Sequence, residues 1–241
     1  GIEEGDEVII PAYTYSATAL AVLHCGAVPV MVDVNDDFTV NIDAIRAAIT
    51  DKTKVIIPVD IAGLPCDYDA LNFLVNEPEI IAKFKSNSEN QKKLGRILVL
   101  SDAAHSIGAL YNGKPAGVLT DITVFSFHAV KNITTGEGGA ICINLPAPFD
   151  AAEEYKTMRL WTLNGQTKDA FTKSQGGGNS WKYDIAFQGL KINMPDICAA
   201  IGLAQIKIYK EVIMPERRRV AQRYHDFFSK KSWAQIPVME D

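Results

Sequence analysis

The chain has 241 residues, of which 47% are hydrophobic and 22% are charged, and its formal net charge at pH 7 is -5. This length is sufficient for one large domain with a buried core. The negative charge argues against nucleic acid as the main partner, because a protein that binds a phosphate backbone usually needs a basic surface. We expect no signal peptide and no membrane span. The four cysteines are widely spaced, which favours a reducing, cytoplasmic location.

Short apolar runs rich in valine and isoleucine alternate with amphipathic stretches along the chain. Such runs are typical of strands buried on both faces of a parallel sheet. The alternation predicts an α/β fold with a mostly parallel central sheet flanked by helices. The expected strands are Val8–Pro11, Val28–Val32, Val55–Val59, Ile97–Leu100, Ile122–Phe127 and Ala140–Ile143. The expected helices are Ser16–Cys25, Ile42–Thr50 (capped by Asn41 or Thr39), Tyr68–Val75 and Ala151–Leu163.

Three stretches are less regular. The polar segment Glu77–Gly95 is compatible with a helix and a surface loop. The glycine run within Gln175–Asn179 fits either a flexible loop near a site or a simple surface connection. Pro195–Phe228 has a long helical pattern, which the proline at Met214-Pro215 should break or kink.

One lysine, Lys131, lies just past an apolar strand, at the start of a glycine-rich turn. A lone lysine there is most simply a solvated loop residue, but a lysine in a partly dry site can become a nucleophile toward carbonyls. Other chemistry-bearing residues also follow predicted strands, namely Tyr15, Asp102 and Ser126. In open α/β sheets, ligands collect at the carboxyl ends of the strands. A lysine, a carboxylate, a hydroxyl and an aromatic ring at one sheet edge suit pyridoxal 5'-phosphate.

With these residues in place, the sequence resembles the DegT/DnrJ/EryC1/StrS family of sugar aminotransferases, which belong to pyridoxal-phosphate fold type I. The resemblance covers nearly the whole chain. Each motif is weak alone, and their order and spacing together are specific. Within the family, the 126–132 and 189–194 segments are most similar to the branch that makes UDP-4-amino-4-deoxy-L-arabinose. The motifs are Pro11-Ala12-Tyr13-Thr14-Tyr15, Gly26-Ala27-Val28-Pro29-Val30, Ala62-Gly63-Leu64-Pro65-Cys66-Asp67, Asp102-Ala103-Ala104-His105 and Gly136-Glu137-Gly138-Gly139.

The resemblance implies a role for each of the strand-end residues. Lys131 would be the Schiff-base lysine and would also shuttle the proton between the amino donor and the cofactor. Asp102 would pair with the pyridinium nitrogen, and His105 would lie near the ring and its 3-hydroxyl. Ser126 would bind the phosphate, and Tyr15 would stack on the ring. No metal ligands are implied. For His105 and Tyr15 a purely structural role, as a satisfied polar residue and a core tyrosine, stays open.

Other positions are less clear from the resemblance. Lys191 and Asn193 fall where many relatives carry Asn and Arg, in a segment that reaches across the family's dimer interface toward the neighbour's phosphate. His128 is expected to be structural, and Glu137 is expected to brace the turn. Asp60 falls where many relatives carry histidine, and its role stays open.

The resemblance also implies a domain organisation. Residues 1–210 would form the pyridoxal-phosphate-binding large domain, without the family's more N-terminal Ser-Gly-Thr segment that contributes to the phosphate site. Residues 211–241 would begin the smaller C-terminal domain, which is also truncated. The implied activity is transfer of an amino group, with glutamate as donor, to a nucleotide-linked keto-sugar, in a homodimer.

Three alternatives stay open. The chain could be a truncated fragment of such an enzyme that does not catalyse the reaction. It could act on a non-sugar ketone, such as a cyclitol. A sugar dehydratase of the same family is disfavoured, because those relatives carry histidine in place of the lysine at Lys131.

Overall fold

The computed structural model describes residues 1–168 and 182–237. Its centre is a six-stranded sheet in which all neighbouring strands are parallel except the last pair. The expected α/β fold with a mostly parallel sheet is therefore confirmed. The predicted loop at Gln175–Asn179 lies outside the described residues. In spatial order the strands are β2 (Val28–Val32), β1 (Glu7–Pro11), β3 (Thr53–Ile56), β4 (Leu98–Asp102), β7 (Ile122–Ser126) and the antiparallel β8 (Gly139–Ile143).

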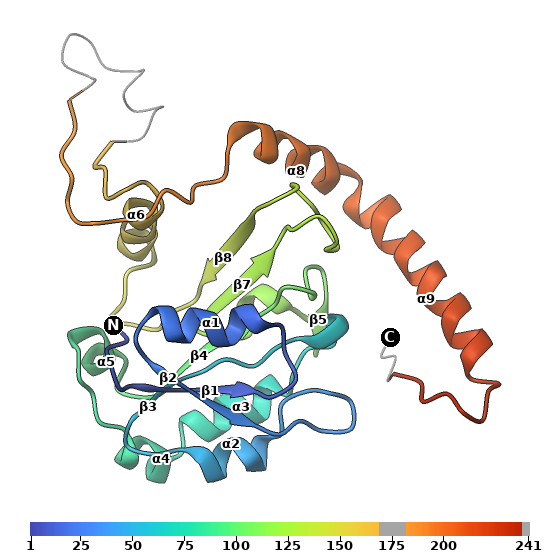
Figure 1. Ribbon diagram of the computed structural model, residues 1–241, viewed down its shortest axis with the longest axis horizontal. Coiled ribbons are helices and arrows are strands. Elements are labelled where there is room, and N and C mark those ends of the chain that lie inside the picture. The colour runs from blue at the N-terminus through green and yellow to red at the C-terminus, as the bar shows by residue number, and fades with distance from the viewer. Residues whose placement is uncertain (169–181, 238–241) are drawn as a thin grey trace.

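Helices cover the sheet on both sides, and Figure 1 shows α2, α3 and α4 grouped on the side away from α1. The side chain of Asn41 caps α2, because its Oδ1 accepts a hydrogen bond of 2.8 Å from the backbone N–H of Ala44. Of the two predicted caps, Asn41 is therefore the one used. No helix of the described segments is long and apolar enough to cross a membrane. The helices are α1 (Ser16–His24), α2 (Ile42–Ala48), α3 (Tyr68–Val75), α4 (Pro78–Lys83), α5 (Glu89–Leu94), α6 (Ala151–Thr162), α8 (Asp196–Ile208) and α9 (Met214–Phe228).

Alternation along the strands divides the core into two layers. Successive side chains of a strand point to opposite faces. On β1, Ile9 joins the larger cluster with side chains of α2 and α3, such as Ile45 and Leu71. Its neighbours Val8 and Ile10 join the second cluster, which includes Val22 of α1. Both faces of the sheet are therefore covered by apolar side chains, which explains why the sequences of its strands are continuous apolar runs.

The third strand differs from the prediction. The regular ladder of β3 covers Thr53–Ile56 and not Val55–Val59. Pro58 has no N–H to donate, so the ladder is interrupted there. Pairing resumes beyond it, where the N–H of Asp60 donates to the carbonyl of Asp102 at 3.0 Å. The interruption thus leaves Asp60 beside the end of β4.

A small hairpin was not predicted. Its strands are β5 (Leu110–Tyr111) and β6 (Lys114–Pro115), and both turn residues have positive φ, 49° at Asn112 and 75° at Gly113. A tight two-residue turn of this kind strongly favours Asn-Gly, so the sequence did contain the signal. The polar segment 77–95 contains α4 and α5 joined by a loop, close to the expectation.

The predicted break in the C-terminal helix lies just before the proline. Tyr209–Ile213 form a π-helical turn, η3, between α8 and α9, and Pro215 falls in the first turn of α9. Proline removes one backbone hydrogen bond and crowds the preceding turn, and a wider turn accommodates both effects. The hydroxyl of Tyr209 donates to the carbonyl of Ile107 at 2.6 Å, which anchors the turn to the body of the domain.

A buried ion pair joins the starts of the two central strands β4 and β7. Arg96 donates to both oxygens of Asp121, at 2.8 and 2.7 Å, and the N–H of Val99 donates to the same carboxylate at 2.9 Å. The side chains are only 16% and 7% exposed. A buried pair of this kind does not itself guarantee stability, but removing one partner leaves an uncompensated charge.

We therefore expect Asp121→Ala to lower the free energy of unfolding by about 3–5 kcal/mol, because Arg96 is left buried and unpaired. Urea denaturation monitored by circular dichroism measures this change. The exposed pair of Lys92 and Glu89 provides the control, since its side chains are 60% and 85% exposed. Glu89→Ala should cost less than about 1 kcal/mol. Equal losses in the two variants would contradict the structural role of the buried pair.

Candidate active site

The carboxyl ends of β4 and β7 bring the predicted residues to one edge of the sheet. The two strands are parallel neighbours, and Asp102 of β4 is in register with Val124 of β7. Asp102 and Ser126 are the last residues of their strands, and Lys131 lies in the loop that follows Ser126. The sequence therefore placed the carboxylate, the hydroxyl and the lysine correctly at the same edge.

The loop that carries Lys131 is held by backbone hydrogen bonds at its base. The N–H of Phe127 donates to the carbonyl of Gly138 at 2.8 Å, and the N–H of Thr135 donates to the carbonyl of Phe127 at 2.9 Å. Helix α8 adds a bond of 3.0 Å from the N–H of Thr134 to Oε1 of Gln205. A Cβ at Gly138 would lie 2.4 Å from the hydroxyl oxygen of Thr135, so this packing requires glycine. The lysine is thus presented by an ordered loop.

Across this loop, Nε2 of His128 lies 3.7 Å from Oε1 of Glu137. Both side chains are exposed on the turn. This position is compatible with the expected bracing role of Glu137 and with a structural role for His128.

The amine of Lys131 contacts a histidine ring. Its Nζ lies 2.8 Å from Nε2 of His105, and the other ring nitrogen, Nδ1, accepts a hydrogen bond of 3.2 Å from the N–H of Ala62. A nitrogen that accepts a backbone N–H carries no proton, so the proton of the neutral ring is on Nε2. In that tautomer the protonated Nε2 is the ring atom that faces the amine of Lys131. The ring thus contacts the lysine amine with one nitrogen and the main chain with the other.

The electrostatics of the histidine agree with this pattern. Burial lowers the pKa of His105 below its ordinary value, and the nearby charge of Lys131 lowers this pKa further. The carboxylate of Asp102 acts in the opposite direction but does not overcome these effects. The imidazole is therefore held in its neutral form.

Asp102 is positioned by a residue that the sequence analysis did not identify. The buried hydroxyl of Thr18, in α1, donates to Oδ2 of Asp102 at 2.9 Å, and the N–H of Ala104 donates to Oδ1 at 3.3 Å. Thr18 lies one helical turn after Tyr15, so helical spacing from the predicted aromatic residue could have indicated it. A second unidentified residue is Asn132, whose Nδ2 donates to the carbonyl of His105 at 2.8 Å.

The remaining predicted residues have exposed or partly exposed polar groups. The hydroxyl oxygen of Ser126 accepts a bond of 3.3 Å from the N–H of His128. Tyr15 is 77% exposed just before α1, so it is not a core tyrosine. Nζ of Lys191 donates to Oδ1 of Asn193 at 2.7 Å, and this segment pairs with the end of α6 through a bridge between Lys191 and Leu163. The structure thus places Lys191 and Asn193 beside α6.

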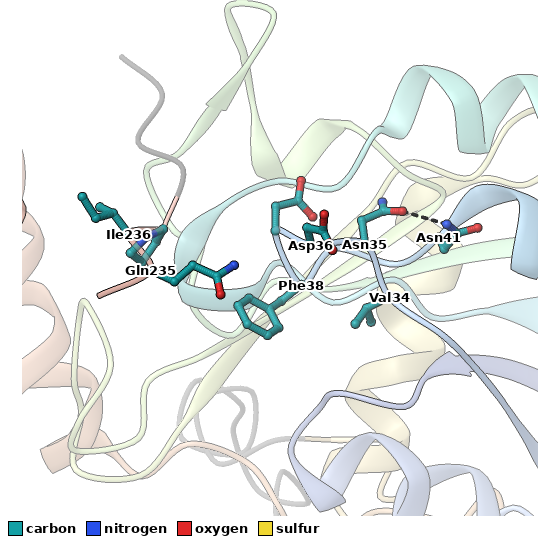
Figure 2. A pocket seen from close by; sticks show the side chains of 9 residues that line it. Val34, Asn35, Asp36, Phe38, Asn41, Gln235 and Ile236 are labelled. Atoms are coloured by element: carbon teal, nitrogen blue, oxygen red, sulfur yellow. Dashed lines mark hydrogen bonds between the residues drawn. The ribbon is translucent and has the colours of Figure 1, made fainter. Parts of the chain in front are cut away.

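A separate cleft of about 710 Å³ opens at the end of β2. Figure 2 shows the loop after β2 on one side of it and the 235–237 segment on the other, with Asn41 donating to Asn35 at 2.8 Å. In the sheet, β2 lies four strand spacings from β7, or about 19 Å at about 4.8 Å per strand. This cleft is therefore distinct from the cluster around Lys131. It is lined by Val34, Asn35, Asp36, Asp37, Phe38, Asn41, Gln235, Ile236 and Pro237.

The sequence of the chain is matched by a known family over nearly its whole length. A sequence model described as the DegT/DnrJ/EryC1/StrS aminotransferase family matches residues 1–83 and 88–240. The chain belongs to this family. The family resemblance inferred from the motifs is therefore confirmed.

Similar proteins come from several organisms. The chain is 38% identical to the uncharacterized protein MJ1066 of Methanocaldococcus jannaschii, over 94% of the chain and 53% of that protein. It is 35% identical to the spore coat polysaccharide biosynthesis protein SpsC of Bacillus subtilis, over 100% of the chain and 56% of SpsC. Among solved structures, the putative sugar aminotransferase Spr1654 of Streptococcus pneumoniae, in its PMP form, superposes with a TM-score of 0.87 and 45% identity. That match covers 95% of this chain and 56% of Spr1654.

The chain thus spans about half the length of the relatives it matches. Its α/β fold with a mostly parallel central sheet matches the structures of pyridoxal-phosphate fold type I sugar aminotransferases. Within the family, the comparisons identify sugar aminotransferases and do not single out the branch that makes UDP-4-amino-4-deoxy-L-arabinose.

The lowered pKa of His105 has a consequence for stability. As the pH falls, the unfolded chain takes up a proton at this residue before the folded protein does, so folding loses free energy from about pH 6.5 downward. The loss is complete once the pH is below the lowered pKa of the folded state. Urea unfolding of the wild type and of His105→Gln at about pH 7.5 and 5.5 measures this effect. The variant should lose less stability than the wild type, and identical losses would show that His105 is not held neutral.

Proposed function

We propose that this DegT-family chain carries the cofactor-binding and catalytic part of a pyridoxal-phosphate-dependent aminotransferase, which transfers an amino group from glutamate to a nucleotide-linked keto-sugar. The observation that carries the proposal is the contact of 2.8 Å between Lys131 Nζ and His105 Nε2, beside the carboxylate of Asp102 at the end of β4. Spr1654, with which the chain shares 42% identity in its PLP form, supports the choice of cofactor.

The residues at this sheet edge fit pyridoxal phosphate chemically. A carboxylate has about four lone-pair sites, and Asp102 uses two of them for Thr18 and Ala104. The others are available for a protonated pyridine nitrogen. Ser126 accepts its bond from His128 and keeps its O–H to donate to a phosphate oxygen. The exposed ring of Tyr15 is available to stack on a planar heterocycle.

When bound, pyridoxal phosphate supplies an electron sink for the negative charge that develops at Cα of the amino donor. The residues of this chain supply the rest. Lys131 would provide the amine for covalent attachment and would then act as the base that moves the proton from Cα. Asp102 would stabilise positive charge on the ring nitrogen, and Thr18 fixes the orientation of the carboxylate. His105 holds the lysine amine in place and keeps its own proton on Nε2.

The substrate is the less direct part of the proposal. SpsC is named for spore coat polysaccharide biosynthesis and Spr1654 is described as a putative sugar aminotransferase, and both support a sugar acceptor. The motif similarity at residues 126–132 and 189–194 supports, more narrowly, the branch that makes UDP-4-amino-4-deoxy-L-arabinose. Glutamate as the donor rests on the family resemblance alone.

Reduction with borohydride tests the attachment site. After incubation of the chain with pyridoxal phosphate and reduction, mass spectrometry of the peptides should find the cofactor on Lys131, because that amine lies against His105 in an ordered loop at the end of β7. Lys131→Ala should lose the modification, whereas Lys114→Ala, which changes an exposed lysine of β6, should keep it. Modification spread evenly over the lysines, or retained in Lys131→Ala, would overturn the proposed function.

We also propose that the protein is a homodimer in which the segment around Lys191 faces the partner, and that residues from 211 onward begin a second domain. Leu190 and Ile192 are exposed apolar side chains that flank Lys191, which supports an interface there. The exposed apolar residues Tyr224 and Phe227 of α9 support a further covering layer.

Light scattering should therefore give twice the chain mass of 26.4 kDa. Ile192→Asp should shift the mass toward one chain, because a charge would be buried in the interface. Leu110→Asp, at an equally exposed apolar residue of the β5 hairpin, is the control and should leave the dimer intact. A wild type that has the mass of a single chain would contradict the dimer.

A further inference from the structure

A carboxylate without an assigned role lies behind the site. Asp60 is only 1% exposed, and its partners are hydroxyl groups and a backbone N–H. Its Oδ1 accepts from the hydroxyl of Tyr68 at 2.5 Å and from the N–H of Cys66 at 3.2 Å. Its Oδ2 accepts from the hydroxyl of Ser106 at 2.6 Å. This set of hydrogen bonds, the Asp60 network, also includes Ser101, whose hydroxyl lies 2.6 Å from that of Tyr68.

Such a group is costly to keep inside the protein. Burial raises the pKa of Asp60, against the lowering effect of its hydrogen bonds to Ser106 and Tyr68. Replacing a buried polar group by a well-packed apolar one is often neutral or stabilising. An aspartate at this position is therefore better explained by what it holds in place than by a contribution to stability.

The Asp60 network holds the two segments that meet at His105. Ser106, whose hydroxyl donates to the carboxylate of Asp60, is the next residue after His105 in the chain. On the other side, Asp60 begins the short turn η1 (Ile61–Gly63), in which Ala62 has a φ of 53° and presents its N–H to His105 Nδ1. The carbonyl of Asp60 accepts from the N–H of Gly63 at 3.1 Å, which closes this turn.

The contact between the two segments is close. A Cβ at Gly63 would lie 3.1 Å from the carbonyl oxygen of His105. The side chain of Asp60 thus fixes the chain after His105, and its main chain fixes the N–H that selects the tautomer of the ring. The same residue controls both sides of the imidazole.

We propose that Asp60 is a positioning residue that fixes His105 in its Nε2–H tautomer and, through this ring, orients the amine of Lys131. The consequence for Lys131 rests on the proposed function, but the tautomer of His105 does not. Asp60 bonds to Ser106 and closes the turn that contains Ala62, so its effect on His105 passes through these two residues.

The tautomer can be measured without cofactor. Long-range ¹H–¹⁵N NMR of the ¹⁵N-histidine-labelled chain distinguishes a protonated from an unprotonated ring nitrogen, and His105→Gln identifies the signals of this ring among the four histidines. The wild type should show a protonated Nε2 and an unprotonated Nδ1. Asp60→Leu should give averaged signals of both tautomers, because Ser106 and the Ala62 turn are released.

Three further variants make the test specific. Asp60→Asn should keep the wild-type pattern, since its amide oxygen still accepts from Cys66 and its amide nitrogen can donate to Ser106. Ser106→Ala removes one hydrogen bond of the Asp60 network and should give signals that are partly averaged between the two tautomers of His105. This variant tests the positioning role if Asp60→Leu does not fold. Ser101→Ala is the matched control, because it alters the outer end of the network and leaves the bond between Asp60 and Ser106 intact. It should keep the wild-type pattern.

The second measurement is the rate at which pyridoxal phosphate becomes trapped on Lys131 by borohydride. Asp60→Leu should react on the order of 10-fold more slowly than the wild type, because its lysine is less well oriented. A wild-type tautomer in folded Asp60→Leu and Ser106→Ala, or a wild type with protonated Nδ1, would overturn the positioning role. If the wild type traps no cofactor but the tautomer of His105 still changes in Asp60→Leu, the proposed function is overturned. The positioning role of Asp60 then remains supported.

Discussion

The parallel alignment of β3, β4 and β7 is the constraint on which the site depends. Parallel strands end at the same edge of a sheet, so residues from three distant parts of the chain meet there without any loop having to reach across the fold. The pair of Arg96 and Asp121 joins the starts of β4 and β7, and the register that follows leaves Asp102 and Ser126 at the ends of adjacent strands. The ion pair and the reactive groups thus lie at opposite ends of the same two strands.

The polar groups of the domain are concentrated where this edge meets the core. Asp60, Ser101 and Ser106 are all buried at or just beyond the carboxyl ends of β3 and β4. Their hydroxyl groups and carboxylate satisfy one another, which offsets the cost of removing them from water. Farther from the core, Asp102 and His105 are partly exposed and keep hydrogen-bonding capacity for a ligand. Polar side chains are therefore buried and mutually hydrogen-bonded next to the core, and partly exposed nearer to Lys131.

Much of this arrangement was predictable from residue patterns, and the exceptions have physical reasons. The buried strands produce continuous apolar runs, so the six strands of the main sheet were recognised along the chain, and Lys131, Asp102 and Ser126 could be placed at strand ends. Thr18 was not identified, because a threonine inside a helical pattern looks like any other helix residue. The role of Asp60 was also open, since its partners come from residues up to 46 positions away and only the folded chain brings them together. Sequence patterns thus predict well which segments are buried and where the strands end. They predict poorly which side chains from distant parts of the chain are in contact.

The π-helical turn at Tyr209–Ile213 also determines how the long helix is attached. The hydroxyl of Tyr209 reaches Ile107, and a Cβ at Gly108 would lie 2.9 Å from the Tyr209 ring. Figure 1 shows α9 extending away from the sheet beyond this point. The junction of α8 and α9 is therefore attached to the domain close to the loop that follows His105. A methyl group at Gly108 would collide with the Tyr209 ring, so the tolerance of this position to substitution reports on how tightly the junction is packed.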